Sequence, residues 1–269
     1  MMAARAAVGL LAAAIIATLA RRAQSLSRGG AVAATLLGMI SAAAGYAWAI
    51  LLIAYFFAST IVSRIGAAEK ERLAGSIVAK GGRRDARQVL ANGGVFGVAA
   101  IGMLLDPSFA WTALAAGSLC ASASDTWATE IGTRFGGVPR SILSGKPVPA
   151  GTSGGVTVIG SLGALAGALF VASVTLAVGW TRIVGLSAAL GGIAGGAVDS
   201  LLGATLQVRR WCDACDSATE RIRHDCGTIT RVSGGIPGLD NDMVNLFSVI
   251  AGGAVATAIF IAMRAWMLG

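Results

Sequence analysis

Long apolar segments separated by shorter polar stretches run through almost the whole chain. The apolar segments cover residues 2–20, 29–45, 46–62, 89–105, 108–132, 154–178, 183–205 and 242–263. A helix needs about 17–25 mainly apolar residues to cross a bilayer. The pattern therefore predicts an all-α, polytopic integral membrane bundle of about eight transmembrane helices. We expect a single transmembrane domain over residues 1–269.

The first apolar segment has two interpretations, a retained helix or a signal peptide. A signal peptide carries its positive charge before the apolar run. Here Arg21 and Arg22 follow the run instead. We therefore expect a retained transmembrane helix.

Composition agrees with a membrane protein and excludes an ordinary soluble domain. Hydrophobic residues make up 55% and charged residues 13% of the chain, and the mean hydropathy is +0.75. Soluble domains average roughly 25% charged residues. The 38 glycines suit close helix packing in lipid, where small residues let backbones approach.

Basic residues divide unevenly between the two sides of the predicted bundle. Of the 21 lysines and arginines, only Arg5, Arg182 and Arg264 fall on one side, which leaves 18 on the other. The positive-inside rule assigns the richer side to the cytoplasm. We expect a multi-pass protein of the cell (inner) membrane with its functional loops on the cytoplasmic side. The net charge of +8 then reflects topology, and no nucleic-acid partner is expected.

Two polar loops carry candidate anion-binding residues. Residues 63–94 are predicted to form two short amphipathic helices broken at Gly81-Gly82, with Arg83, Arg84 and Arg87 within one turn of the second. Such arginines either contact anionic lipid headgroups or clamp a phosphate, and composition alone favours the first. Residues 133–153 contain Lys146 and lead into GTSGGVT at the predicted start of a helix. Glycines there either bind an anion through backbone N–H groups or serve packing.

The loop over residues 207–240, inserted between the seventh and eighth predicted helices, carries soft metal ligands. Cys212 and Cys215 form Cys-x-x-Cys, and His224 and Cys226 form His-x-Cys. Two tight pairs of this kind are typical of a structural Zn²⁺ site. The alternative is a set of free thiols in a flexible loop. The fourth cysteine, Cys120, is expected to be a packing residue.

Acidic residues near the ends of three apolar segments are the most informative feature of the sequence. Asp125 and Asp199 end small-residue-rich segments that run in the same direction, and each is followed by a hydroxyl residue. This faint repeat predicts two carboxylates at matching depth. Carboxylates near hydrocarbon are costly and usually functional. The remaining candidates are Glu130 and the polar start of the last helix, with Asn241, Asp242 and Asn245.

Hard oxygen ligands from several helices suit Mg²⁺, which is typically held by one or two carboxylates and by substrate phosphates. We expect Asp125, Asp199 and Asp242 to be the Mg²⁺ ligands. With the nearby arginines, this pattern favours phosphoryl transfer. Structural roles remain as alternatives, because Asp125 could pair with Arg134, and Asp240 or Asp242 could cap the last helix.

At these residues the chain resembles a known family. GGRRDARQVLANGG (81–94), SDTWATEIG (124–132), GTSGGVT (151–157), VDSLLGATLQ (198–207) and LDNDMVN (239–245) occur in that order. They resemble the integral membrane family called domain of unknown function 92, or transmembrane-protein-19-like, which includes a plant phytyl-phosphate kinase. The resemblance implies a phosphotransferase that converts a membrane-embedded isoprenyl monophosphate to the diphosphate with a nucleoside triphosphate.

The expected activity is thus that of a CTP- or ATP-dependent isoprenyl-phosphate kinase. The candidate catalytic residues are Asp125, Glu130, Asp199, Asn241, Asp242 and Asn245. The candidate phosphate-binding residues are Arg83, Arg84, Arg87, Asn92, Thr126, Lys146, Ser153, Gly154, Gly155 and Ser200. Two other classes stay open: an ion-coupled transporter, and a membrane scaffold that binds a partner through residues 207–240. The sequence leaves the nucleotide, the prenyl length and the oligomeric state open.

Overall fold

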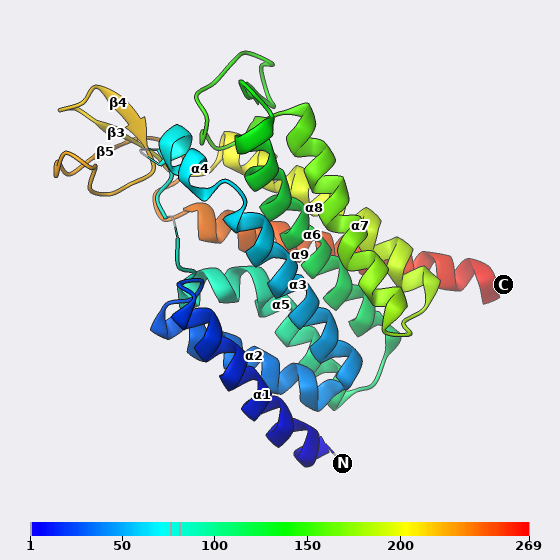
Figure 1. Ribbon diagram of the computed structural model, residues 1–269. Coiled ribbons are helices and arrows are strands. Elements are labelled where there is room, and N and C mark those ends of the chain that lie inside the picture. Colours follow the sequence, from blue (N-terminus) through cyan, green and yellow to red (C-terminus); the bar gives the residue numbers. More distant parts are fainter. Residues whose placement is uncertain (1, 76, 81, 269) are drawn as a thin grey trace.

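The protein is a helical bundle with a small sheet at one end (Figure 1). The computed structural model describes residues 2–75, 77–80 and 82–268. Within these residues the helices are α1 (Met2–Arg22), α2 (Arg28–Ala44), α3 (Tyr46–Arg64), α4 (Ala67–Ala74), α5 (Ala86–Leu105), α6 (Phe109–Phe135), α7 (Val158–Ala177), α8 (Arg182–Thr205) and α9 (Asn241–Leu268). The strands are β1 (Arg140–Ser141), β2 (Gly155–Val156), β3 (Arg209–Cys212), β4 (Ser217–Thr219) and β5 (Arg231–Gly234).

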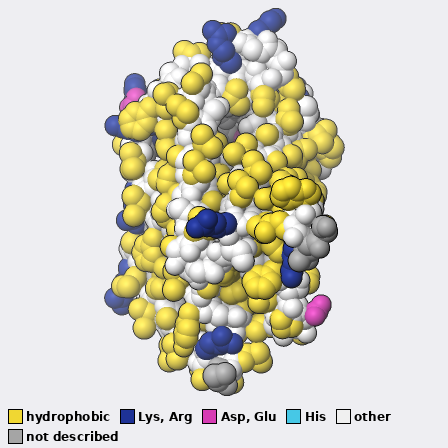
Figure 2. Space-filling model, turned by 90° about the vertical axis from the view of Figure 1, so that its right-hand side faces the viewer, with side chains coloured by type: hydrophobic (Ala, Val, Ile, Leu, Met, Phe, Trp, Pro, Cys, Tyr) yellow, Lys and Arg dark blue, Asp and Glu magenta, His cyan; other side chains and the backbone are white. Residues whose placement is uncertain are grey.

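The predicted all-α membrane bundle is confirmed, because each apolar segment of the sequence forms one long helix. Among the described residues, six helices are long and apolar enough to cross a membrane: α1, α3, α5, α7, α8 and α9. The helix α2 is shorter, with 17 residues, and α6 has 27 residues but carries charged side chains at its end. Hydrophobic side chains cover most of the face seen in Figure 2, as expected for a surface in contact with lipid.

The helix α6 is the centre of the bundle and packs against α3, α5, α7, α8 and α9. Its buried residues between Thr112 and Ser124 are almost all Ala, Ser, Gly or Cys. Small side chains allow neighbouring helices to approach on every side, which lipid itself does not drive. The last third of α6, which carries Asp125 and Glu130, is less buried and opens toward the loops.

The helices α1 and α2 form a peripheral pair, because α1 packs mainly on α2 and α2 joins the bundle through α3 and α5. Both chain ends lie at the end of the bundle away from the sheet (Figure 1). The end that carries α4, the sheet and the loops is called the polar end below.

The predicted pair of amphipathic helices between α3 and α5 is only half correct. The segment forms one short helix, α4, and the predicted break at Gly81 lies outside the described residues. The predicted second helix is wrong, because Arg83 and Arg84 precede α5 instead of sharing a helical turn with Arg87. The cause is Asp85, whose side chain accepts a hydrogen bond from the Gln88 amide N–H at 2.9 Å while Gln88 Oε1 accepts one from the Asp85 N–H. This capping box starts α5 at Ala86.

The cap at Asp85 gives the first prediction. Asp85→Ala should destabilise the protein by about 1 kcal/mol, because an orphan amide loses its acceptor, whereas Asp85→Ser should keep most of the cap. Burial opposes ionisation, but the amide of Gln88 and the ammonium of Lys80 outweigh it and lower the pKa of Asp85. Its contribution is therefore present at neutral pH and is lost as the pH falls through that lowered pKa. Thermal unfolding of both variants at pH 7 and pH 3 checks this, and an equal loss for Ala and Ser would contradict it.

The Gly-rich stretch before α7 also differs from expectation. It was expected to start the helix at residue 154, but Gly155 and Val156 form β2, which pairs antiparallel with β1. The helix α7 begins at Val158, where the Thr157 hydroxyl accepts a hydrogen bond from the Gly160 N–H. The stretch therefore forms a turn and a strand, and its glycines are not at the helix N-terminus.

Residues 207–240 fold into a three-stranded antiparallel sheet in the order β4-β3-β5. The register pairs Cys212 with Ser217 and Arg209 with Gly234. Figure 1 shows this sheet projecting from the polar end beside α4. Its strands hold the cysteines and the histidine close to one another.

Candidate functional site

Glycines on α8 bring this helix against α6 in a fixed register. A Cβ atom added at Gly192 would lie 2.5 Å from the Cβ of Cys120, and one added at Gly195 would lie 2.5 Å from the Cβ of Ala121. A Cβ added at Gly196 would meet the hydroxyl of Ser124 at 2.6 Å. Because only glycine allows these approaches, the backbones cross closely one helical turn before the two acidic residues.

This crossing gives the second prediction. Gly192→Val should force α6 and α8 apart and cost about 1–3 kcal/mol, the usual cost of overpacking. The matched control is Gly94→Val on α5, because no atom lies within 4 Å of a Cβ added there. The thermal unfolding midpoints of the two variants in the same detergent check the prediction. Equal midpoints would show that the crossing is not closely packed.

The crossing places the carboxyl groups of Asp125 and Asp199 within hydrogen-bonding reach of each other. Both side chains are half-buried. The Asn245 amide, oriented to satisfy its neighbours, donates to Asp199 Oδ2 at 3.2 Å and to the carbonyl of Asn241 at 3.2 Å. Among the described residues, no lysine or arginine forms an ion pair with either carboxylate. Two adjacent carboxylates without a cation repel each other unless a proton or a metal ion lies between them.

The paired carboxylates line a cavity of about 950 Å³ at the polar end of the bundle. Its walls come from α3 to α9 and from residues 150–157. The volume is at the upper end of the range for small-molecule sites. Basic side chains also line it, namely Arg64, Lys70, Lys80, Arg84 and Arg221. The cavity therefore combines a carboxylate pair with a positively charged wall.

The other predicted acids line the same cavity but already have basic partners. Glu130 accepts two hydrogen bonds of 2.7 Å from the Lys70 ammonium. Asp242 pairs with Lys80 at 2.5 Å and with Arg87 Nε at 3.7 Å, and its side chain is only 4% exposed. Hydrogen bonds from Lys80 to Asp242 and Asp85 outweigh burial and raise the pKa of Lys80. These acids are therefore neutralised by lysines, unlike the pair of Asp125 and Asp199.

The predicted phosphate-binding residues divide into two groups. The cavity is lined by Arg84, Asn92, Thr126, Ser153, Gly154, Gly155 and Ser200, together with Asn241 and Asn245. Arg83, Arg87 and Lys146 were expected there and are not among its lining residues. Arg83 and Lys146 are exposed, and Arg87 is turned toward Asp240, with which it pairs at 2.8 Å.

Arg84 is held in place from two sides. Its backbone N–H donates to the Ser25 carbonyl and its own carbonyl accepts from Ser27, both at 3.0 Å. Its guanidinium Nη2 donates to the hydroxyl of Ser63 at 3.2 Å. Within the described part of the chain, Arg84 forms no ion pair. Its positive charge is therefore available to an anion in the cavity.

Several polar residues of the cavity wall are not predicted by the sequence. Arg221, next to β4, donates from Nε to the Val78 carbonyl at 3.0 Å and from Nη2 to the Gly75 carbonyl at 2.5 Å. Glu220 accepts hydrogen bonds from Ser153 and, at 2.8 Å, from Gln207, and burial raises its pKa. The backbone N–H of Glu220 also donates to the Ile77 carbonyl at 2.8 Å. These bonds attach the sheet to Gly75, Ile77 and Val78, and to Ser153 and Gln207. Gly75 and Val78 line the cavity. No local sequence pattern predicts these bonds.

The four soft ligands of the sheet converge on one point. One ligand atom each from Cys212, Cys215, His224 and Cys226 lies within 4.8 Å of the others. The Sγ atoms of Cys212 and Cys226 are 3.6 Å apart, close to the roughly 3.8 Å between sulfurs of a tetrahedral Zn²⁺ site with bonds of about 2.3 Å. The Nδ1 atom of His224 is buried and has no hydrogen-bond partner among the described residues. The donor set therefore fits a closed tetrahedral metal site.

Comparisons with known proteins agree with an integral membrane protein. Residues 11–253 match the family described as integral membrane protein DUF92. Protein PGR of Arabidopsis thaliana is 31% identical over 263 residues, covering 88% of this chain and 89% of that protein. The uncharacterized membrane protein MJ0933 of Methanocaldococcus jannaschii is 28% identical, covering 94% and 93%.

A second Arabidopsis thaliana relative, Protein VTE6, chloroplastic, is 32% identical over 161 residues, which cover 55% of this chain and 46% of that protein. No solved structure matches the chain. The family match spans most of the sequence, including the carboxylate pair and the Cys/His sheet. The protein therefore belongs to the DUF92 family of integral membrane proteins.

Proposed function

We propose that the protein is a phosphotransferase that converts a membrane-embedded isoprenyl monophosphate to the diphosphate, with a nucleoside triphosphate as donor. The observation that carries this proposal is the pair of Asp125 and Asp199, which lies without a basic partner of its own in a large cavity with a basic wall. The family resemblance suggests the isoprenyl acceptor, and the residues of the cavity suggest the phosphate chemistry.

The donor set fits Mg²⁺. Two carboxylates from different helices offer hard oxygen ligands and leave positions for phosphate oxygens, as is usual for this ion. Asp125 and Asp199 would hold it, with Asn241 and Asn245 beside them. Asp242, also expected as a ligand, is the weaker candidate because Lys80 already neutralises it. The ion supplies charge neutralisation and orientation of the transferred phosphate.

The basic wall of the cavity would bind the remaining phosphate oxygens. Arg84 forms no ion pair within the described residues and offers a planar fork of N–H groups, which suits phosphate. Lys70 and Lys80 are held in place by Glu130 and Asp242. Phosphoryl transfer depends mainly on positioning and on charge neutralisation, and these residues provide both.

The reaction needs no strong general base. An oxygen of the acceptor monophosphate forms the new bond to the γ-phosphorus, and the bond from that phosphorus to the β-phosphate oxygen breaks. The electron pair leaves with the nucleoside diphosphate. Because the acceptor is already ionised at neutral pH, no proton has to be removed. This agrees with the cavity lining, which contains no histidine among the described residues.

The proposal is tested by incubating purified protein with phytyl or geranylgeranyl monophosphate, Mg²⁺ and either CTP or ATP. We expect the prenyl diphosphate and the nucleoside diphosphate in equal amounts. Chelation of Mg²⁺ should stop the reaction, and readdition should restore it. No diphosphate from any prenyl length with either nucleotide would contradict the proposed function.

We also propose that Cys212, Cys215, His224 and Cys226 hold a structural Zn²⁺ ion. All four coordination positions would be filled by the protein, which is typical of structural sites. Following the positive-inside rule, we place this sheet and the cavity in the cytoplasm.

Ion-coupled transport is a second candidate function, and one observation favours it. Asp125 and Asp199 lie close enough to share a proton, and membrane carboxylates often form proton relays. Asp199 is, however, six residues before the end of α8, roughly 9 Å from the polar end, whereas carrier sites lie near the midplane. Proton-driven uptake into proteoliposomes without any phosphoryl transfer would reverse this ranking.

A further inference from the structure

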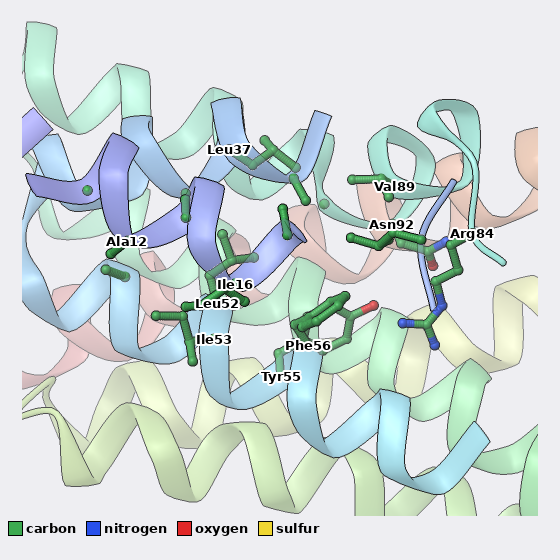
Figure 3. A pocket seen from close by; sticks show the side chains of 18 of the residues that line it. Ala12, Ile16, Leu37, Leu52, Ile53, Tyr55, Phe56, Arg84, Val89 and Asn92 are labelled. Carbon is green, nitrogen blue, oxygen red and sulfur yellow. The ribbon is translucent and has the colours of Figure 1, made fainter. Parts of the chain in front are cut away.

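An apolar groove lies beside the polar cavity, between the peripheral pair α1–α2 and the helices α3 and α5. Its walls are formed by small and branched side chains such as Ala12 and Ile16 of α1, Leu37 of α2, and Leu52 and Phe56 of α3. Figure 3 shows these side chains gathered along one stretch of the groove. No acidic side chain is among its lining residues in the described part of the chain. The groove therefore suits a hydrocarbon chain.

One end of the groove is polar and belongs to the cavity as well. Arg84, Gln88, Asn92 and Thr126 line both spaces. In Figure 3, Arg84 and Asn92 stand together at the end opposite Ala12. The two spaces are therefore adjacent and share this wall, in which Arg84 forms no ion pair among the described residues.

A hydrogen-bonded chain of side chains fixes this junction. The Tyr55 hydroxyl and the Ser122 hydroxyl are 2.6 Å apart, and Ser122 Oγ donates to Asn92 Oδ1 at 2.7 Å. The Asn92 amide nitrogen donates to the Gln88 carbonyl at 2.9 Å. These bonds connect α3, α5 and α6 where the apolar walls give way to polar ones. The groove thus has one apolar end and one anion-binding end.

The direction of the groove matches an amphiphile that crosses half of the bilayer. Its lining extends along α1 from Gly9 to Ala17 and then to Leu26 at the polar end. Gly9 lies 13 residues before Arg22, the end of α1, which is roughly 20 Å along a helix. The groove itself holds about 140 Å³. The groove therefore encloses only part of one hydrocarbon chain, and the rest of that hydrocarbon chain would lie against lipid.

We propose that this groove binds the hydrocarbon tail of the prenyl monophosphate, whose phosphate then meets Arg84 at the mouth of the cavity. This inference rests on the proposed function for the identity of the ligand. A single apolar chain ending in a phosphate matches one narrow groove that ends at a guanidinium without an ion pair among the described residues, whereas a bilayer phospholipid has two chains. Small residues at the far end, Ala12 and Ala49, then set the longest tail that fits.

The test is photolabelling in detergent with a geranylgeranyl monophosphate that carries a diazirine at the end of its tail, followed by mass spectrometry of the labelled peptides. We expect the label on α1 and α3 near Ala12 and Ala49, with displacement by unlabelled prenyl monophosphate. Ala12→Phe should reduce the labelling at least fivefold. Ala7→Phe is the matched control, because Ala7 is also exposed on α1 but does not line the groove.

The outcomes separate this inference from the proposed function. Label on α7, α8 or α9, which do not line the groove, would overturn the groove as the tail site, even if the protein makes prenyl diphosphate. Equal displacement by an anionic phospholipid would identify a lipid site and overturn it as well. Labelling at Ala12 without any turnover would support the groove and contradict the kinase. If the protein turns over prenyl monophosphates, Ala12→Phe should lower the rate with geranylgeranyl monophosphate more than the rate with geranyl monophosphate. Equal losses of rate would contradict the role of Ala12 in limiting the length of the tail.

Discussion

Asp125→Asn and Asp199→Asn should each lower phosphoryl transfer by roughly 10²–10³-fold, because each removes one charge from the site that neutralises the transferred phosphate. The two carboxyl groups face each other across the contact of α6 with α8, and neither has a basic partner among the described residues. The substitution keeps the shape of the side chain. Initial rates with a prenyl monophosphate, a nucleoside triphosphate and Mg²⁺ measure the effect.

Folding of these variants should be unaffected or improved. Removing one of two adjacent negative charges relieves repulsion in the metal-free protein. We therefore expect the metal-free unfolding midpoint to stay or rise, while the stabilisation of the wild type by Mg²⁺ disappears. Asp106→Asn, on an exposed residue at the end of α5, is the control and should change neither property. Wild-type rates for either site variant would remove that residue from the site.

Removal of the proposed Zn²⁺ site should unfold the sheet of residues 207–240. In Cys212→Ala we expect no bound Zn²⁺ and cleavage within residues 207–240 under mild trypsin digestion. Cys212 is completely buried, and the sheet of short strands has little core of its own. Structural Zn²⁺ in small peptides contributes about 10–16 kcal/mol of binding energy, so its removal should unfold the sheet. Metal content and the rate of proteolysis check this.

The same variant should also impair the cavity. Glu220 and Arg221 next to β4 fasten the segment around Ile77 and Val78, and that segment carries on to Lys80. Unfolding of the sheet would release it. Cys120→Ala is the control, because Cys120 lies in the bundle core, where its Sγ contacts the Ala168 carbonyl at 3.5 Å. Equal zinc content in both variants would contradict the proposed metal site.

The helices of the bundle could be predicted from the sequence alone. The free energy of transferring a segment into lipid depends on the composition of that segment, which the sequence contains. The eight apolar segments became helices with ends displaced by at most five residues. The largest shifts are at the start of α7, where Gly155 and Val156 form a strand, and at the end of α9. The proximity of Asp125 and Asp199 could also be predicted from the sequence, since both follow small-residue segments that run in the same direction. Their chemical role remains a prediction.

The rest of the cavity depends on contacts that no local pattern contains. Arg221 meets the Val78 carbonyl across 143 positions of the chain, and Lys80 meets Asp242 across 162. Arg87 was expected in the cavity from its place in the basic cluster, but it pairs with Asp240 and Asp242 and does not itself line the cavity. The side on which a loop arginine lies is decided by such partners, and these become visible only once the chain is folded.

Binding of Mn²⁺, a spectroscopic substitute for Mg²⁺, tests the central claim most directly. Electron paramagnetic resonance titration of the zinc-loaded protein should show one bound Mn²⁺ per chain, which Mg²⁺ displaces. Asp125→Asn and Asp199→Asn should each weaken this binding at least about tenfold, whereas Asp106→Asn should leave it unchanged. The same affinity in all four proteins would show that the two facing carboxylates of α6 and α8 hold no metal ion.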